Sequence, residues 1–563
     1  MTSVEFYREA SFKETLMGKI PKDWKFAFLD EVSDEIRTGP FGSQLKKIEL
    51  SKSGVKVYTQ ENVLKRNFSA GNLRISKAKF EKLKKMEVKP GDVLITIRGT
   101  TGTSAVFPED AEKGIIHTNL AIIRTKKGLL SPEYLSFLIN DFSLIKFQIR
   151  GLSSATTLGA LYAKQIRKIK IPLPPVSEQK KIVEILSTVD KAIQKTDEII
   201  AKIERLKKGL IQELLTKGIN LFALEKEKIL RCVRKCFENR DHEFGREENL
   251  NHHLAKYLKN EFSEYDVDVE VEKKHRRRPD IVIHKRHTDQ NLFAIEVKKD
   301  WNLREIIEDV RKLEEVMLGG YNYCEAIFIG FNVENFDSVF RLSNRINFIL
   351  VNSKGEIKLR IRKREFKETR IGRIPKEWKV VRLGDIITYK KGRKPVVLFD
   401  KKEPNTLPYL TADNLRTGIF TQWAREEDDV VKVNEDDLLL IWDGFYCGDS
   451  FTGFKGILSS TMIKIEPKKP NLDKRYLYYF LKTRFKILNS QIAGMYLKHV
   501  SKFVFESLRV PLPSLAEQRK IAEILSSVDK RLKIERNEKE KLERIKQALM
   551  DLLLTGKIRV KVA

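Results

Sequence analysis

The sequence predicts an α+β multidomain protein in which two similar globular units are each followed by a long helix, with an α/β domain inserted between the two halves. Residues 18–25 return almost unchanged as residues 372–379, and Pro-Leu-Pro followed by Glu-Gln occurs at residues 172–179 and again at residues 511–518. Such repetition indicates two copies of one structural unit. A stretch of roughly 145 residues without a counterpart, residues 222–365, predicts the insert.

Composition narrows the class of protein. At 563 residues the chain exceeds one core, and a prior of roughly 150 residues per domain favours three or four domains. The formal charge of +30 favours an anionic partner such as nucleic acid. The alternative is a surface rich in both signs of charge, as in heat-adapted proteins, because 33% of the residues are charged.

Cysteine usage and the lack of long apolar runs predict a compartment. Four scattered cysteines are too few for a disulfide framework, so a reducing environment is expected. Cys232 and Cys236 lie four apart without zinc-ligand spacing and are expected to pack in a core. No run of about eighteen apolar residues occurs, so we expect a cytoplasmic protein without a membrane span.

The repeat spacing separates a variable part of each half from a constant part. Trp24 and Trp378 are 354 residues apart, whereas Pro172 and Pro511 are 339 apart. The globular part is therefore 15 residues shorter in the second copy, and the stretch after it keeps one frame. We expect globular domains over residues 10–175 and 366–513.

The constant part predicts two long helices, over residues 176–218 and 514–556. Apolar residues at alternating spacings of three and four run from Ile182 to Leu214, and a matching stripe in the second copy is interrupted at Glu535 and Lys539. At 1.5 Å per residue each helix would be roughly 60 Å long. The stripes favour an antiparallel coiled coil between the helices, and the alternative is two ordinary surface helices.

The globular parts are expected to be mostly β. Short apolar runs at residues 55–58, 93–97 and 120–123 have counterparts at residues 409–410, 438–442 and 462–465. Residues 58–63 also echo residues 410–415. These local echoes predict a common fold for both domains.

These paired motifs resemble those of the DNA-specificity subunit of type I restriction-modification systems, over about residues 10–220 and 366–560. The resemblance implies two target-recognition domains, each reading half of a bipartite site in double-stranded DNA, with the helices as a ruler between them. It also implies two methyltransferase subunits and a restriction/translocase subunit as partners. S-adenosylmethionine and ATP would belong to those partners, and the recognition domains themselves would hold no cofactor.

The insert carries its own acidic pattern. Asp280 begins one apolar strand-like run, and Glu296 and Lys298 lie in the next, on one face because side chains alternate along a strand. A helix and a further strand follow, which predicts a parallel pair with a crossover helix. Two carboxylates and a lysine in one cleft suit Mg²⁺ and phosphodiester chemistry, with Asp280 and Glu296 as the metal ligands.

This arrangement resembles the PD-(D/E)xK nuclease core. An acidic residue on the preceding helix often completes the metal site in that family, and Glu247 shares a face with Leu250 and Leu254. The resemblance implies catalytic roles for Asp280, Glu296, Lys298 and Glu247.

Two alternatives to a nuclease stay open for the insert. The pattern is loose enough to arise by chance, and a degenerate domain could bind DNA through Lys274 and residues 276–278. If the insert cuts DNA, the chain is itself an Mg²⁺-dependent endonuclease directed by its recognition domains. If it does not, the insert could be a docking module for a partner subunit.

Other catalytic motifs are absent from the sequence. There is no GxxxxGK[ST] loop, no Asn-Pro-Pro-Tyr or Asp-Pro-Pro-Tyr tetrapeptide and no HExxH. Methylation or translocation of DNA would therefore fall to another subunit. In the variable domains, polar residue types that contact base edges and phosphates are the candidates for DNA binding, although most such residues are simply surface: Arg37, Gln44, Gln60, Asn62, Arg98, Lys390, Arg393 and Asn414.

Overall fold

The structure is a computed structural model that describes residues 5–15, 18–40, 44–154, 160–238, 247–269, 279–285, 290–318, 323–426, 429–490, 492–493 and 498–561. The chain divides into two compact units. Unit 1 contains residues 1–202 and 533–563, and unit 2 contains residues 203–532. The expectation of an α+β multidomain protein is confirmed.

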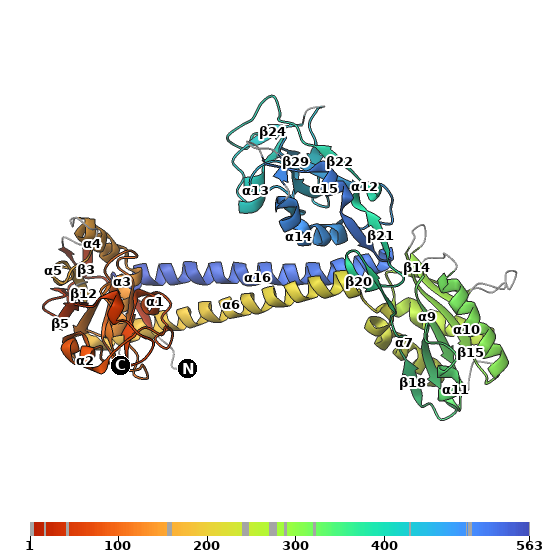
Figure 1. The fold of residues 1–563 in the computed structure, drawn as a ribbon, viewed down its shortest axis with the longest axis horizontal. Helices are drawn as coiled ribbons and strands as arrows, with labels where there is room; N and C mark the ends of the chain where they lie inside the picture. Colours follow the sequence, from red (N-terminus) through yellow and green to blue (C-terminus); the bar gives the residue numbers. More distant parts are fainter. Residues whose placement is uncertain are drawn as a thin grey trace. The chain divides into compact units, whose positions relative to one another are not determined.

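The first repeat domain lies in unit 1 and consists of short strands and helices (Figure 1). Its elements, with the short strand that precedes it, are β1 (Phe6–Arg8), β2 (Phe12–Thr15), β3 (Gly18–Pro21), β4 (Lys25–Phe28), β5 (Ser33–Thr38), η1 (Lys47–Glu49), β6 (Val55–Tyr58), α1 (Gln60–Leu64), β7 (Arg74–Ile75), α2 (Lys77–Lys82), η2 (Lys84–Met86), β8 (Val93–Thr96), β9 (Ser104–Val106), β10 (Gly114–Ile116), β11 (Leu120–Thr125), α3 (Pro132–Asp141), α4 (Ser143–Ser154), α5 (Ala163–Arg167) and β12 (Lys170–Leu173).

The second repeat domain lies in unit 2. Its elements are β19 (Phe366–Thr369), β20 (Gly372–Pro375), β21 (Lys379–Arg382), α12 (Leu383–Ile386), β22 (Ile387–Lys391), β23 (Thr406–Leu410), α13 (Ala412–Thr417), β24 (Trp423–Arg425), β25 (Lys432–Val433), β26 (Leu438–Ile441), β27 (Ser450–Phe451), β28 (Gly456–Leu458), β29 (Met462–Pro467), α14 (Lys474–Ser490), β30 (Ile492–Ala493), β31 (His499–Val500), α15 (Lys502–Ser507) and β32 (Arg509–Leu512).

The two domains have the same strand connectivity. The main antiparallel sheet has the order β5-β11-β8-β9 in the first domain and β22-β29-β26-β27 in the second. A second sheet contains one parallel pair in each domain, β6 with β10 and β23 with β28. The strands predicted from the short apolar runs are present, so the expectation of a common fold is confirmed.

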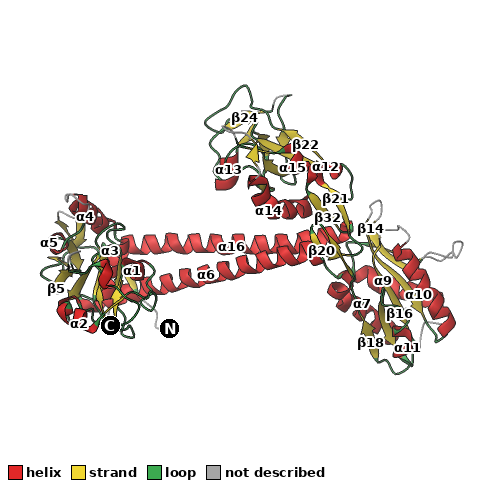
Figure 2. Ribbon diagram, viewed as in Figure 1, coloured by secondary structure: helices red, strands yellow, loops and turns green. Residues whose placement is uncertain are grey.

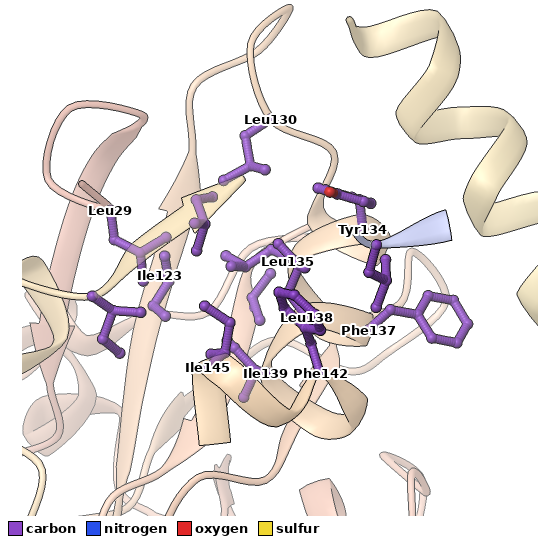
Figure 3. Close-up of a cluster of buried hydrophobic side chains, with 14 of the residues drawn as sticks. Leu29, Ile123, Leu130, Tyr134, Leu135, Phe137, Leu138, Ile139, Phe142 and Ile145 are labelled. Atoms are coloured by element: carbon purple, nitrogen blue, oxygen red, sulfur yellow. The ribbon is translucent and has the colours of Figure 1, made fainter. Parts of the chain in front are cut away.

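Each main sheet buries one face against helices. In the first domain the side chains of α3 pack with Leu29 and Ile123 in one apolar cluster (Figure 3). Tyr134, at the start of α3, is fully buried and donates its hydroxyl to the Pro172 carbonyl at 3.3 Å, as Tyr476 of α14 does to the Pro511 carbonyl at 2.7 Å. The packing of helix on sheet is therefore also repeated.

Two long helices come after the repeat domains, α6 (Val176–Lys217) and α16 (Leu515–Leu553), each continuous in Figure 2. In unit 1, Asp197 of α6 pairs with Lys539 of α16 at 2.7 Å, and Asp190 pairs with Lys546 at 2.8 Å. One heptad forward along α16 is thus one heptad back along α6, so the two segments run antiparallel. The interruption of the apolar stripe at Lys539 is explained by this ion pair.

The duplicated motifs join each repeat domain to the start of its helix. Trp24 donates its indole N–H to Glu178 at 3.2 Å, and Trp378 donates to Glu517 at 3.0 Å. All four side chains are buried. The Ile-Pro-x-x-Trp and Glu-Gln motifs recur together because they are two sides of one contact.

An arginine completes each contact, but from a different position in the chain. Arg559 on β33 (Ile558–Val560) donates to both carboxylate oxygens of Glu178, at 3.0 and 2.8 Å. Arg364, which precedes β19, lies 2.8 and 2.9 Å from the two oxygens of Glu517. Each arginine also binds the carboxylate that comes just before the tryptophan, at 2.8 and 2.7 Å. We call these groups the first anchor (Trp24, Glu178, Arg559) and the second anchor (Trp378, Glu517, Arg364).

The insert forms one mixed sheet covered on both faces by helices. Its elements are α7 (Leu221–Glu238), α9 (Glu247–Glu261), β13 (Asp266–Val269), β14 (Ile281–Lys285), β15 (Gln290–Lys298), α10 (Leu303–Leu318), β16 (Tyr323–Gly330), α11 (Phe336–Phe340), β17 (Asn347–Val351) and β18 (Ile357–Arg360). The sheet order is β13-β14-β15-β16-β17-β18. β15 and β16 are parallel and are joined through α10, as predicted. Separate apolar clusters under α7 and α9 and under α10 define the two faces.

The cysteine and membrane expectations have simple outcomes. Cys232 and Cys236 are buried in the insert core, which confirms their packing role, and all four cysteines of the chain are free thiols. Among the described helices, none combines the length and the apolar character that a membrane crossing needs.

Candidate nucleic-acid interface

At one end of the main sheet of each repeat domain, several loops meet. In the first domain, the Gly39 N–H donates to the Leu120 carbonyl at 2.8 Å and the Ile97 N–H to the Asn119 carbonyl at 2.9 Å. In the second domain the same two bonds occur at the equivalent positions, from Gly392 to Met462 at 2.9 Å and from Trp442 to Thr461 at 2.8 Å. We call these meeting loops the first loop cluster (residues 39–40, 44–46, 59–60, 97–103 and 117–119) and the second loop cluster (residues 392–398, 411–413, 442–449 and 459–461).

A glycine at the strand end fixes this geometry in both domains. A Cβ atom at Gly39 would lie 2.2 Å from the His117 carbonyl oxygen, and one at Gly392 would lie 2.2 Å from the Ser459 carbonyl oxygen. Both obstacles are backbone, so a larger residue could not be accommodated without moving the loop. The framework of the loop clusters is therefore constant, while the loop sequences differ.

Several of the predicted DNA-contacting residues come together in the first loop cluster. Gln60 begins α1, and its amide lies 3.8 Å from the position of a Cβ on Gly99 in the loop that carries Arg98. The Arg98 guanidinium lies over the Tyr162 ring, 5.8 Å from its centroid. The Gln60 Oε1 and Arg98 Nε atoms are buried without a hydrogen-bond partner in the described part of the chain. A buried polar atom without a hydrogen-bond partner is rare in folded proteins, so a ligand or a bound water that supplied the missing partner would be favoured here.

Arg37 and Gln44 border the same cluster. Arg37 lies on β5, which leads into Gly39, and forms an ion pair with Glu35. Gln44 is exposed in the loop beyond that strand. His117 was not singled out from the sequence, although its backbone shapes the cluster, and burial lowers the pKa of its imidazole. A single histidine between two apolar runs, residues 115–116 and 120–123, gave no signal of its own.

Asn62 and Asn414, which were predicted to contact DNA, cap short helices. Each occupies the third position of a short helix and accepts the N–H of the threonine that caps it, at 2.9 Å from Thr59 and 3.3 Å from Thr411. The Asn62 amide donates to two backbone carbonyls, both at 2.9 Å, and the Asn414 amide donates to the Ile419 carbonyl at 2.6 Å. Because both buried amides are committed to capping, neither belongs to the candidate interface.

The second loop cluster carries exposed basic residues. Lys390, two residues before Gly392, and Arg393, the residue after it, are exposed, and Arg393 pairs with Asp429 at 3.2 Å. Lys391 forms a 2.8 Å ion pair with Asp443 of the neighbouring loop. The same loop carries Phe445, which was not predicted from the sequence. Its signal in the sequence was a Gly-Phe-Tyr-Cys-Gly run between two apolar stretches.

In the insert, the predicted acidic residues lie close together. Asp280 accepts the Val297 N–H at 2.9 Å, which holds it beside Glu296 on the neighbouring strand. The Glu296 side chain is only 2% exposed, and burial, together with the charge of Asp280, raises the pKa of its carboxyl. Lys312 of α10 lies 2.6 Å from Glu296. Two close carboxylates, one of them buried, form an arrangement that a cation would stabilise.

The remaining predicted residues of the insert have different outcomes. Lys298 lies on the same face as Glu296, as expected, and pairs with Glu305 of α10 at 2.7 Å. The backbone of Glu247 begins α9, but its side chain lies outside the described residues. Among the side chains that the structure describes, no three His, Cys, Asp or Glu residues are grouped so as to hold a metal ion. The site therefore offers Asp280 and Glu296 as a pair.

Comparison with known proteins gives the family. The family described as "Type I restriction modification DNA specificity domain" matches residues 21–205 and 375–544, more than half of the chain. The type I restriction enzyme MjaVIII specificity subunit of Methanocaldococcus jannaschii is 43% identical over 190 residues, which are 34% of this chain and 45% of that relative. The putative MjaX specificity subunit of the same organism is 24% identical over 568 residues, 99% of each chain, so that match includes the insert.

One solved structure matches nearly the whole length of this chain. The crystal structure of the type I restriction-modification S subunit from M. genitalium is 13% identical, covers 97% of this chain and 99% of its own chain, and superposes with a TM-score of 0.47. The family match over both repeat domains shows that this chain belongs to the type I restriction-modification DNA specificity family.

Proposed function

We propose that this chain is the subunit that selects the DNA sequence in a type I restriction-modification complex, with each repeat domain reading one half of a bipartite target. The observation that carries this proposal is the pair of loop clusters, in which the same two backbone hydrogen bonds and the same glycine contact hold loops with different side chains. A constant framework with exchangeable loops is suited to two different half-sequences. The net charge of +30 supports double-stranded DNA as the partner.

Within the loop clusters we assign the DNA contacts to six of the predicted residues. Gln60 and Arg98 lie together in the first loop cluster and are of the residue types that pair with base edges, and their buried Oε1 and Nε atoms would gain a partner if the loop shifts or a bridging water enters on binding. Arg37, Gln44, Lys390 and Arg393 border the same loops and are suited to phosphates.

We further propose that α6 and α16 form an antiparallel coiled coil to which two methyltransferase subunits bind, and that a restriction/translocase subunit joins them. The ion pairs one heptad apart, Asp197 with Lys539 and Asp190 with Lys546, support the coiled coil. S-adenosylmethionine and ATP would be bound by those partners. The four free thiols support the cytoplasm as the compartment.

The test is a domain exchange. Residues 10–175 are replaced by the corresponding segment of a relative with a different target, and the methylated sequence is mapped for the assembled complex. We expect one half of the methylated sequence to change and the other half to stay. A change in both halves would contradict the assignment of one domain to each half.

For the insert we propose a second function, a nuclease-like domain of PD-(D/E)xK type that holds Mg²⁺ between Asp280 and Glu296. The buried Glu296 carboxyl with its raised pKa beside Asp280 favours this hypothesis. Mg²⁺ commonly keeps several waters and needs only one or two carboxylates from the protein. When bound, the ion would polarise a phosphodiester and lower the pKa of a water.

The residues around the pair have separate roles in this proposal. The Val297 N–H would position the Asp280 carboxylate, and Lys312 balances the charge of Glu296 through its 2.6 Å ion pair. Lys298 would balance negative charge on the phosphodiester, once released from Glu305.

Nicking of supercoiled plasmid with Mg²⁺ tests the nuclease. The Asp280→Asn variant keeps an acceptor for the Val297 N–H but removes the charge, so loss of nicking would not reflect a broken fold. Glu308→Ala on the exposed face of α10 is the matched control and should nick like the wild type. If wild-type complex and Asp280→Asn behave alike, the insert is not a nuclease, and the sequence-selecting function is unaffected.

A further inference from the structure

A large aromatic side chain projects from the second loop cluster. Phe445 lies in the loop between β26 and β27 and is 68% exposed. Its ring touches Tyr446 edge to face, with the centroids 5.0 Å apart, and the Lys498 ammonium lies 4.9 Å from the ring centroid. An exposed phenylalanine leaves apolar area in water that a partner could cover.

The loop that carries Phe445 is held in place by its backbone. The Gly444 N–H donates to the Lys498 carbonyl at 2.7 Å, and the Asn489 amide donates to the Phe445 carbonyl at 3.0 Å and to the Cys447 carbonyl at 3.1 Å. Gly448 adopts a φ of +92° and approaches α14 so closely that a Cβ would lie 2.6 Å from the Leu488 Cβ. The exposed ring is thus presented on a rigid support, so little conformational entropy would be lost on binding.

Basic side chains lie beside Phe445 and its neighbour Tyr446. Lys498 lies over Phe445, and the Arg416 guanidinium lies over the adjoining Tyr446 ring. Lys391 is anchored in the same loop cluster through Asp443. Cations placed around an exposed apolar side chain fit a duplex, where phosphates flank the bases.

The corresponding loop of the first domain has no aromatic residue. Between β8 and β9 it contains Thr100 and Thr101 where the second domain has the Phe445 loop. A surface that binds the same protein partner in both halves should be alike in both, whereas a surface that reads two different half-sequences should differ. The difference therefore favours DNA over a partner protein as the occupant.

We propose that Phe445 enters the base stack of the half-site read by the second domain and acts as an apolar wedge between two base pairs, while Lys498 and Arg416 bind the flanking phosphates. The proposal rests on the sequence-selecting function and names a residue that carries it. Apolar wedges of this kind unstack a base step and bend the duplex. The first domain, lacking the aromatic residue, would read its half-site without such a wedge.

The test uses the complex assembled with its methyltransferase subunits and a duplex carrying the sequence that this complex methylates. We compare the wild type with Phe445→Ala, Phe445→Leu and the control Phe503→Ala, a phenylalanine of the same domain that is 77% exposed on α15. Phe445→Ala should weaken specific binding roughly 5- to 100-fold, as loss of a stacked aromatic does. Phe445→Leu should retain most of the affinity, and Phe503→Ala should bind like the wild type.

A fluorescent base analogue, 2-aminopurine, placed at successive positions of the second half-site reports unstacking. Its fluorescence should rise on binding the wild type at one step and should not rise with Phe445→Ala. Equal affinity and equal fluorescence for those two proteins would overturn the proposal. Loss of subunit assembly with unchanged DNA affinity would overturn it in favour of a protein contact. Failure of the wild type to prefer its methylated sequence would instead refute the sequence-selecting function.

Discussion

Replacing Arg364 by alanine should destabilise unit 2, and more strongly at alkaline than at acidic pH. Arg364 lies 2.8 and 2.9 Å from the two oxygens of the buried Glu517; without it, the partners of that carboxylate among the described residues are the Trp378 indole and the Ile219 N–H. Breaking a buried ion pair from one side costs about 3–5 kcal/mol of unfolding free energy. For a unit of this size that is a fall in Tm on the order of 5–10 °C.

The pH dependence comes from the direction of the Glu517 shift. Burial raises the pKa of Glu517 above its ordinary value of 4.5, and the Arg364 charge opposes that rise. A raised pKa in the folded state adds stability at low pH that is lost as the pH rises through the folded value. Removal of Arg364 raises the pKa of Glu517 further, so the loss of stability should be smaller near pH 4.5 than at pH 8; the lost bonds to Glu377 and to the Lys217 and Ile219 carbonyls contribute at both pH values.

Thermal unfolding of wild type, Arg364→Ala and the exposed control Arg370→Ala at the two pH values measures the effect. Adding Glu517→Gln to Arg364→Ala should recover part of the loss at pH 8, since a neutral amide can be buried at lower cost than an unpaired charge. A Tm of Arg364→Ala within 1–2 °C of the wild-type Tm at pH 8 would correspond to a loss of less than about 1 kcal/mol of unfolding free energy. That result would refute the role given to the second anchor.

Three further variants have equally definite expectations. Gly218→Ala should lower the unfolding free energy by about 2 kcal/mol or more, because φ is +69° and the new Cβ would lie 2.2 Å from a Glu517 oxygen. The control Gly209→Ala, on the exposed side of α6, should slightly raise the Tm in the same thermal unfolding assay. Asn414→Ala should cost about 1–2 kcal/mol in chemical denaturation and leave the methylated sequence unchanged; a changed sequence would restore the DNA-contact hypothesis for this residue. Asp280→Asn should lower the pKa of Glu296, measured by titration of ¹³C-labelled glutamate carboxyls, and an unchanged pKa would argue against their coupling.

The sequence predicted the features that depend on local pattern. Apolar runs located strands such as β6 and β26, the heptad stripe located α6, and the strand-helix-strand order around Glu296 gave the parallel pair in the insert. Period and spacing suffice for such features because neighbouring residues decide them. Residue type alone does not distinguish an exposed amide from one that caps a helix, so the sequence did not reveal the capping bonds of Asn62.

The anchors could not have been predicted in this way. Nothing near Glu178 in the sequence indicates that its partner is Arg559, 381 residues away on the last strand. Nor does periodicity show that Phe445 is exposed, since exposure depends on how Gly444 and Asn489 fix the loop. Local pattern does not specify long-range pairing or backbone strain.

The second anchor also explains how an insert is accommodated at its position. After α16, the chain turns at Gly556 against Trp24, and β33 then supplies Arg559 to the first anchor. After α6, the chain makes the same turn at Gly218 against Trp378, but α7 of the insert begins at once, so no β33-like strand comes next in the described chain. Arg364, from the far side of the insert, provides the missing arginine.

The two arginines thus make the same contacts with the buried glutamate, although they come from different positions in the sequence of each half. Arg364 donates to the Lys217 and Ile219 carbonyls, both at 3.0 Å, as well as to Glu517, and so ties together the two ends of the chain between which the insert lies. An inserted domain that left this contact unmade would have left Glu517 buried and unpaired, at the cost in stability that such a charge carries. With the insert in place, both repeat domains therefore have the same kind of attachment to their helices, a buried tryptophan and glutamate completed by an arginine.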